Sequence, residues 1–155
     1  MRQDWERVHR ALWRMTGDPE LARDLTQETF LRAQGAAGRG AGERPLPWLL
    51  RVARNLWIDH LRRLGHRPLE AFDDRGELGA HDPAMRRLDE DTGIEAHLRQ
   101  LPANWQQALI LRHMNDLTVE DVARVMGVPE GTVKTWLHRG RARLAGWLVE
   151  AEERS

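Results

Sequence analysis

Apolar residues recur every three or four positions along most of this chain, a pattern that restricts it to an α-helical fold. Trp5, Val8, Leu12 and Met15 show the pattern in the first segment, and this spacing places them on one face of a helix. The sequence lacks runs in which polar and apolar residues strictly alternate, which is the pattern of half-buried strands. We therefore predict an all-α protein.

Glycine, proline and acidic residues divide this helical pattern into two units. Residues 35–47 contain four glycines and two prolines, which indicates a loop within the first unit. Residues 69–92 are acidic, rich in turn-forming residues and without helical periodicity, so we predict a flexible linker there. The predicted organisation is a small helical domain over residues 1–68, the linker, and a second helical domain over residues 93–150.

Local signals mark where several helices begin and end. Gly17 is expected to end the first helix, and Asp18 is expected to cap the second. Thr118 resembles the first residue of a capping box that opens a short helix, and Gly127 is expected to end it. The longer helices are predicted over residues 19–33, 47–64 and 130–149.

The formal net charge of zero conceals opposite local charges. Residues 1–68 have 13 arginines against 8 acidic side chains, a net charge of +5, and residues 101–148 have 6 basic against 4 acidic, a net charge of +2. The intervening residues 69–100 have 4 basic against 9 acidic, a net charge of −5. Two basic blocks around an acidic segment are compatible with a nucleic-acid partner, because local charge is a better guide to partners than the total.

Composition argues against several other classes of protein. The chain has no cysteine and its only serine is Ser155, which excludes disulfides, thiolate metal sites and serine catalysis. Its histidines lack paired metal-ligand spacing, so we predict no metal, no cofactor and no enzyme. The N-terminal residues are charged, unlike a signal peptide, and the longest apolar run, residues 46–50, is far shorter than the ~20 residues of a membrane span. We expect a cytoplasmic protein with no membrane span.

Residues 117–144 carry the most informative motif. Ala123, Gly127 and Val133 have the spacing of a helix-turn-helix, in which the small residue permits close approach, the glycine makes the turn and the valine packs the second helix on the first. Such a second helix fits the major groove of DNA, where its polar residues contact bases and phosphates. Its polar faces hold Lys134, Thr135, His138, Arg139, Arg141 and Arg143. The alternative is a helical hairpin with a solvated basic face.

Two further helices carry candidate sites. The helix predicted over residues 47–64 combines cations with aromatic residues, a combination that suits unpaired bases, although tryptophans at helical spacing are more often core anchors. Its relevant residues are Trp48, Arg51, Arg54, Asn55, Trp57, Arg62 and Arg63. Residues 24–30 alternate acidic or amide groups with large apolar ones, which indicates either a surface helix or a protein-docking face.

Together, three stretches resemble the extracytoplasmic-function (ECF) sigma factors, a two-domain group of bacterial transcription initiation factors. Residues 22–33 (ARDLTQETFLRA) are similar to the signature helix of the first sigma domain. Residues 48–63 (WLLRVARNLWIDHLRR) are similar to the promoter-melting helix. Residues 101–144 are similar to the second domain with its helix-turn-helix, and the three stretches follow the order of the family.

The resemblance implies partners and a role for named residues. Core RNA polymerase would bind Asp24, Leu25, Gln27, Glu28 and Phe30. The −10 promoter element would be contacted by Trp48, Arg51, Val52, Asn55, Arg62 and Arg63. The −35 element would be contacted by Thr132, Lys134, Thr135, Trp136, His138, Arg139, Arg141 and Arg143. The resemblance also implies an anti-sigma factor that occludes these surfaces.

The chain departs from the family pattern in several places. Trp136 stands where arginine is common, so it either contacts a thymine methyl or a sugar, or packs inward beside the apolar stripe of its helix. Trp105 replaces a usually polar residue, and residues 35–47 lack the aromatic residue that members often carry. The first helix is one or two turns short, as expected if the true start lies upstream. A free-standing helix-turn-helix regulator and a helical adaptor protein are the alternatives to sigma activity.

Overall fold

The computed structural model describes residues 2–35, 45–65 and 93–154, and every regular element within these ranges is helical. The prediction of an all-α fold is confirmed for this part of the chain. Most of the predicted loop at 35–47 and the whole predicted linker at 69–92 lie outside the described residues. Among the helices that are described, none is both long and apolar enough to cross a lipid bilayer.

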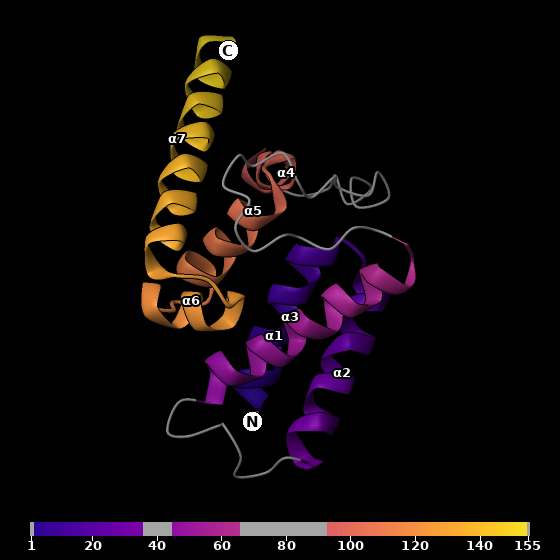
Figure 1. Ribbon diagram of the computed structural model, residues 1–155. Helices are drawn as coiled ribbons and strands as arrows, with labels where there is room; N and C mark the ends of the chain where they lie inside the picture. Colours follow the sequence, from indigo (N-terminus) through magenta and orange to yellow (C-terminus); the bar gives the residue numbers. More distant parts are fainter. Residues whose placement is uncertain (1, 36–44, 66–92, 155) are drawn as a thin grey trace.

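The first three helices pack into a bundle (Figure 1). They are α1 (Arg2–Thr16), α2 (Pro19–Gly35) and α3 (Pro45–Arg63). Val8, Leu12 and Met15 are buried as the sequence predicts. Gly17 has a left-handed φ of 72°, and the Asp18 carboxylate accepts hydrogen bonds from the backbone N–H groups of Glu20 and Leu21 at 3.0 and 3.2 Å. The predicted end of α1 and the predicted cap of α2 are thus confirmed.

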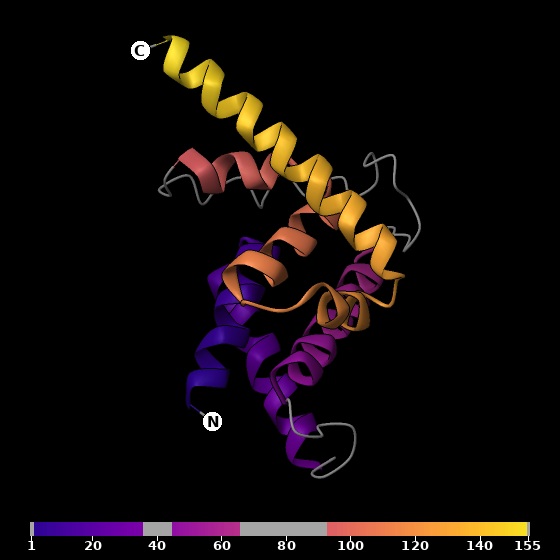
Figure 2. The ribbon, with the colours of Figure 1, turned by 90° about the vertical axis from the view of Figure 1, so that its left-hand side faces the viewer.

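The second group of helices contains the helix-turn-helix. It consists of α4 (Gly93–Gln100), α5 (Ala103–Leu109), the π-helical turn η2 (Ile110–Met114), α6 (Val119–Met126) and α7 (Glu130–Arg154). The Thr118 hydroxyl accepts a 3.1 Å hydrogen bond from the Asp121 N–H. Gly127 is left-handed, with φ 69°, and its N–H donates to the Ala123 carbonyl at 2.8 Å. Both predicted ends of α6 are confirmed, and α7 continues five residues past its predicted end, projecting beyond its neighbours in Figure 2.

The turn between α5 and α6 was not predicted. At η2 the helix widens, so that the Asn115 N–H donates to the Ile110 carbonyl five residues earlier, at 3.1 Å. Asp116 then adopts a left-handed φ of 56°, and the Arg112 guanidinium donates to the Leu117 carbonyl at 2.9 Å. A single widened turn is too short to define a period of its own, which is why the sequence pattern did not indicate it.

The two groups of helices pack against each other through α3 and α6. These helices lie side by side in both ribbon views (Figures 1 and 2). Their buried apolar residues form one continuous cluster, which joins Leu50 and Leu56 of α3 to Val122 and Val125 of α6. The predicted flexible linker left this arrangement open, so the contact is a finding of the structure.

Candidate protein and nucleic-acid interfaces

The exposed side of α2 presents an acidic face with one apolar residue. Asp24, Gln27, Glu28 and Leu31 are all exposed, and their spacing of three, four and seven positions places them along one side of a helix. Leu31 has 62% of its surface exposed. We call these four residues the α2 acidic face. Leu31 was not among the contact residues predicted from the sequence, although it stands three positions after Glu28 and seven after Asp24.

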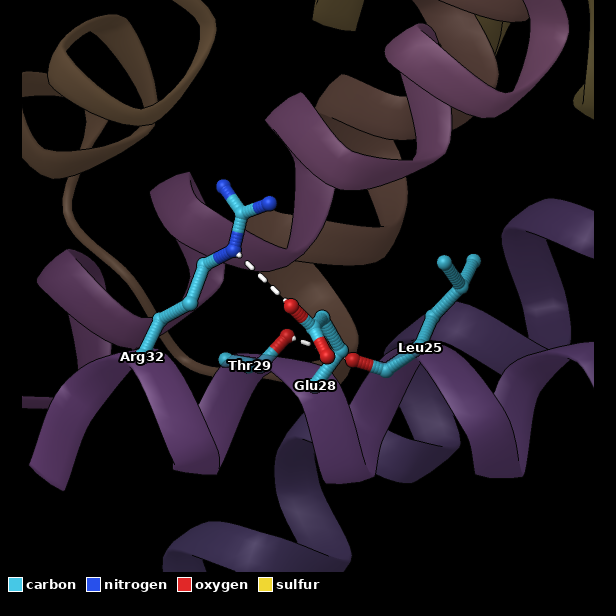
Figure 3. Close-up of polar contacts among 4 residues, drawn as sticks. All are labelled: Leu25, Glu28, Thr29 and Arg32. Carbon is cyan, nitrogen blue, oxygen red and sulfur yellow. Dashed lines mark hydrogen bonds and ion pairs between the residues drawn. The ribbon is translucent and has the colours of Figure 1, made fainter. Parts of the chain in front are cut away.

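The α2 acidic face excludes two residues that were predicted to dock a partner. Leu25 is only 9% exposed and lies in the apolar core, and Phe30 is half-buried against that core. The Thr29 hydroxyl donates to the Leu25 carbonyl at 2.7 Å, while Arg32 pairs with Glu28 at 3.2 Å along the outside of the helix (Figure 3). In this conformation Leu25 is a core residue and not a contact residue, because its neighbours in the bundle cover it.

The outer side of α3 presents a mixed basic and aromatic face. Arg51 and Asn55 are exposed, and Trp48 and Val52 are half-buried beside them. These four residues also follow the three-four-seven spacing of one helical side, and we call them the α3 face. Arg62 and Arg63 are exposed at the end of the helix, where Arg62 pairs with Asp59 at 3.5 Å.

Arg54 and Trp57 differ from the other cations and aromatic residues of α3 because both are buried. Arg54 is 6% exposed, and its Nε donates to Gln107 Oε1 at 2.5 Å, while a terminal guanidinium nitrogen donates to the Met126 carbonyl at 3.5 Å. Burial lowers the pKa of Arg54 to about 10, which leaves the guanidinium charged at neutral pH. Grouping Arg54 with the exposed arginines was therefore wrong for this conformation, and Trp57 is a core anchor.

The exposed side of α7 is basic along the first part of the helix. Lys134, His138, Arg139 and Arg141 are exposed there, while Thr132 and Thr135 are half-buried. We call these six residues the α7 basic face. His113 from η2 lies close enough to be affected: burial, then the positive charges of Arg141 and Arg112, lower the pKa of His113. The position of His113 beside this face was not predicted, because His113 precedes the helix-turn-helix motif in the sequence.

Two tryptophans of the second group belong to its core. Trp136 is fully buried and lies in the same apolar cluster as Val133 and Leu137. Of the two alternatives for Trp136, inward packing is confirmed, and the predicted contact with DNA is wrong for this conformation. Trp105 is also buried, and the guanidinium carbon of Arg143 lies 4.7 Å from its ring centroid. Arg143 thus already has a cation–π partner within the chain.

Comparison with known families assigns both groups of helices. Residues 3–67 match the family model described as Sigma-70 region 2, and residues 93–144 match the one described as Sigma-70, region 4. The first match contains the α2 acidic face and the α3 face. The second contains the helix-turn-helix and the α7 basic face. The two matches follow one another along the chain and are separated by residues 68–92.

Individual relatives are named as sigma factors. The chain is 33% identical to the ECF RNA polymerase sigma factor SigM of Bacillus subtilis, covering 88% of this chain and 85% of SigM. It is also 33% identical to the ECF RNA polymerase sigma factor SigE of Mycolicibacterium smegmatis. That alignment covers 97% of this chain but only 60% of the length of SigE. The sigma factor RpoE of Bartonella quintana, solved with the anti-sigma factor NepR, superposes with a TM-score of 0.72 at 22% identity over 94% of this chain and 92% of RpoE. That likeness shows a shared fold.

Proposed function

The chain belongs to the ECF sigma factors, and we propose that it binds core RNA polymerase and directs it to promoters through both of its helical groups. Sigma factors are initiation factors and not enzymes, so the proposed role lies in binding alone. The observation that carries the proposal is the presence of regions 2 and 4 in order on one chain, each with exposed faces suited to its task. Because the polymerase is cytoplasmic, we propose the same location for this chain.

The α2 acidic face is the proposed contact with core polymerase. Asp24 and Glu28 suit a basic partner surface, because complementary charge steers and orients association. Leu31 adds an apolar group at the edge of these carboxylates, of the kind that gains free energy when a partner covers it. The family resemblance supports this helix as the docking element, and the exposure of its residues supports Asp24, Gln27, Glu28 and Leu31 as the contacts.

We expect Leu31→Ala to weaken binding to core polymerase about tenfold, because truncation removes apolar surface that the partner would cover. Leu64→Ala is a matched control, since Leu64 is 58% exposed and follows α3 directly, so it is not part of α2. Fluorescence anisotropy of the labelled chain titrated with core polymerase measures both affinities. Equal affinities for the two variants would remove Leu31 from the interface.

The proposed DNA contacts lie on the other two faces. The α3 face would contact the −10 element, where Arg51 and Asn55 are exposed beside the indole of Trp48 and unpaired bases can stack. Arg62 and Arg63 would hold the DNA backbone nearby. The α7 basic face would enter the major groove of the −35 element, with Lys134, Arg139 and Arg141 on phosphates or bases.

Each DNA contact by itself is small, so we propose that the polymerase joins them. A few arginine contacts per face give weak, salt-sensitive affinity. Docking both groups of helices on one polymerase turns the second contact into an intramolecular event and raises its effective concentration. Since the related RpoE was solved with the anti-sigma factor NepR, we also propose that an anti-sigma factor controls this chain by covering one or more of these faces.

Run-off transcription tests the proposed function. Core polymerase is incubated with a library of promoter fragments, with and without this chain, and the transcripts are sequenced. Promoter-specific transcripts that require the chain are expected. Their absence across the library, together with a DNA footprint by the chain alone, would instead favour a free-standing helix-turn-helix regulator.

A further inference from the structure

The side chain of Arg54 joins the two groups of helices. It is buried beside the exposed α3 face and ends against α5 and α6, where it makes the hydrogen bonds to Gln107 and to the Met126 carbonyl. An arginine is seldom buried unless it is paired. Here both acceptors come from the other group of helices, so the native environment of this guanidinium exists only while the two groups are in contact.

The position of Met126 makes this contact favourable for a cation. Met126 is the last residue of α6, and the left-handed Gly127 follows it at the turn of the helix-turn-helix. Helix C-terminal carbonyls carry a partial negative charge and attract positive side chains. Arg54 therefore supplies a positive charge to the C-terminal end of α6 from a helix that lies more than 70 positions away in the sequence.

A second hydrogen bond joins the two groups at another point. The side-chain amide of Asn115, just after η2, donates to the Arg7 carbonyl of α1 at 3.3 Å. The unusual backbone of this turn, with its π-helical hydrogen bond and the left-handed Asp116, places Asn115 at α1. We call the arrangement in which the two groups of helices are packed together the closed arrangement. It has polar contacts on both α3 and α1, in addition to the apolar cluster.

The closed arrangement is too small to engage both promoter elements. The −10 and −35 elements are about 25 base pairs apart, which is about 85 Å of B-form DNA at ~3.4 Å per base pair. A compact chain of this length has a radius of gyration of about 15 Å. The 29 residues between α3 and α4 have a maximum reach of about 100 Å. Simultaneous contact with both promoter elements therefore requires α3 and α6 to separate.

We propose that Arg54 is an interdomain latch, whose hydrogen bonds to Gln107 and Met126 hold the free protein closed and must break before both promoter elements are bound. The requirement for opening rests on the proposed sigma function, whereas the latch itself is a property of the free chain. The α3 face and the α7 basic face both stay accessible in the closed arrangement. The latch therefore limits the distance between the two faces and does not cover either one.

The distance between the two groups can be measured directly by single-molecule fluorescence energy transfer. The chain has no cysteine, so Glu20→Cys in α2 and Glu130→Cys in α7 introduce unique labelling sites at exposed positions. The free labelled protein is expected to show mostly high transfer, and addition of core polymerase with promoter DNA is expected to lower it. A free protein that already shows low transfer would overturn the latch without recourse to any variant.

Two variants test the residues that form the latch. Arg54→Ala removes both donors, and Gln107→Leu leaves the buried guanidinium without its Nε acceptor. Each is expected to shift the ratio of closed to open molecules about tenfold toward open, the effect of losing a hydrogen bond to a charged group. Arg124→Ala is the matched control, because Arg124 is exposed and pairs with Glu120 inside its own helix at 2.6 Å.

Circular dichroism separates opening from unfolding. Unchanged helicity with reduced transfer in either latch variant supports the proposal, and unchanged helicity with unchanged transfer in both contradicts it. If both variants lose helicity, two other transfer efficiencies show whether interdomain hydrogen bonds hold the chain closed. One is that of Asn115→Ala, which lacks the second hydrogen bond between the groups, and the other is that of the wild-type protein. Because these measurements on the free chain need no transcription, the latch can fail while sigma activity stands, and run-off transcription can fail while the latch stands.

Discussion

Replacing Trp136 with alanine is expected to destabilise the helix-turn-helix by about 3–5 kcal/mol, the range for removing a buried tryptophan from a core. The indole is fully buried in the cluster that joins α7 to the other helices of its group. A loss of this size is a large fraction of the 5–15 kcal/mol by which a whole protein is typically stable. The melting temperature should fall by about 10 °C or more, and promoter binding should be lost with the fold.

The stability measurement separates a core tryptophan from a DNA-contacting one. Lys134→Ala, on the exposed side of the same helix, should leave the melting temperature unchanged. Trp136→Phe should keep much of the stability, because it retains a large aromatic ring in the same space. If Trp136→Ala melted like the wild-type protein while promoter affinity dropped, Trp136 would be a DNA contact after all and the buried position would be wrong.

The second large effect is expected for the double substitution Arg139→Ala with Arg141→Ala. Both side chains are exposed on the α7 basic face, and each proposed phosphate contact contributes about 0.9 to the slope of log affinity against log salt. The slope for holoenzyme binding to a transcribed promoter fragment should therefore fall by about 1.8. Affinity should drop most at low salt, while the melting temperature should change little.

A charge-matched control keeps this test specific. Arg10→Ala with Arg23→Ala also removes two exposed cations, but from α1 and α2. That variant should retain the salt slope of the wild-type protein. If both double variants lowered the salt slope by the same amount, general charge, and not the α7 basic face, would determine promoter affinity.

The helices and the α7 basic face were predictable because their signals are local. The Asp18 cap, the left-handed Gly127 and the buried Val133 each depend on residues a few positions away, and all appear as predicted. A helix-turn-helix also fixes which side of its second helix is exposed, since the Ala123–Gly127–Val133 spacing determines how the two helices pack.

The misassigned residues depend on contacts between distant segments. Arg51 and Arg54 are one turn apart on α3, yet Arg51 is exposed and Arg54 is buried. Nothing near them in sequence distinguishes them, because Gln107 and Met126 supply the environment of Arg54. The same limit applies to Leu25. The family resemblance implied that Leu25 contacts the polymerase, but the packing of the bundle buries Leu25 and leaves Leu31 exposed.

Charge shows the same contrast between local and total quantities. The overall balance of 24 basic and 24 acidic residues suggested no preference for nucleic acid. When the charge is divided by segment, the basic excess lies in residues 1–68 and 101–148, which contain the α3 face and the α7 basic face. The structure adds that one of these cations, Arg54, is held inside the protein and contributes nothing to the surface in the closed state.

Hydroxyl-radical footprinting tests the central claim most directly, namely that this chain recognises a promoter in two places only as part of a polymerase complex. The template is a promoter fragment that yields a chain-dependent transcript. With core polymerase and the chain together, we expect protection at two patches about 25 base pairs apart, about 85 Å along B-form DNA, and no protection by either component alone. Full protection by the chain without polymerase would contradict the account and identify a free-standing DNA-binding regulator.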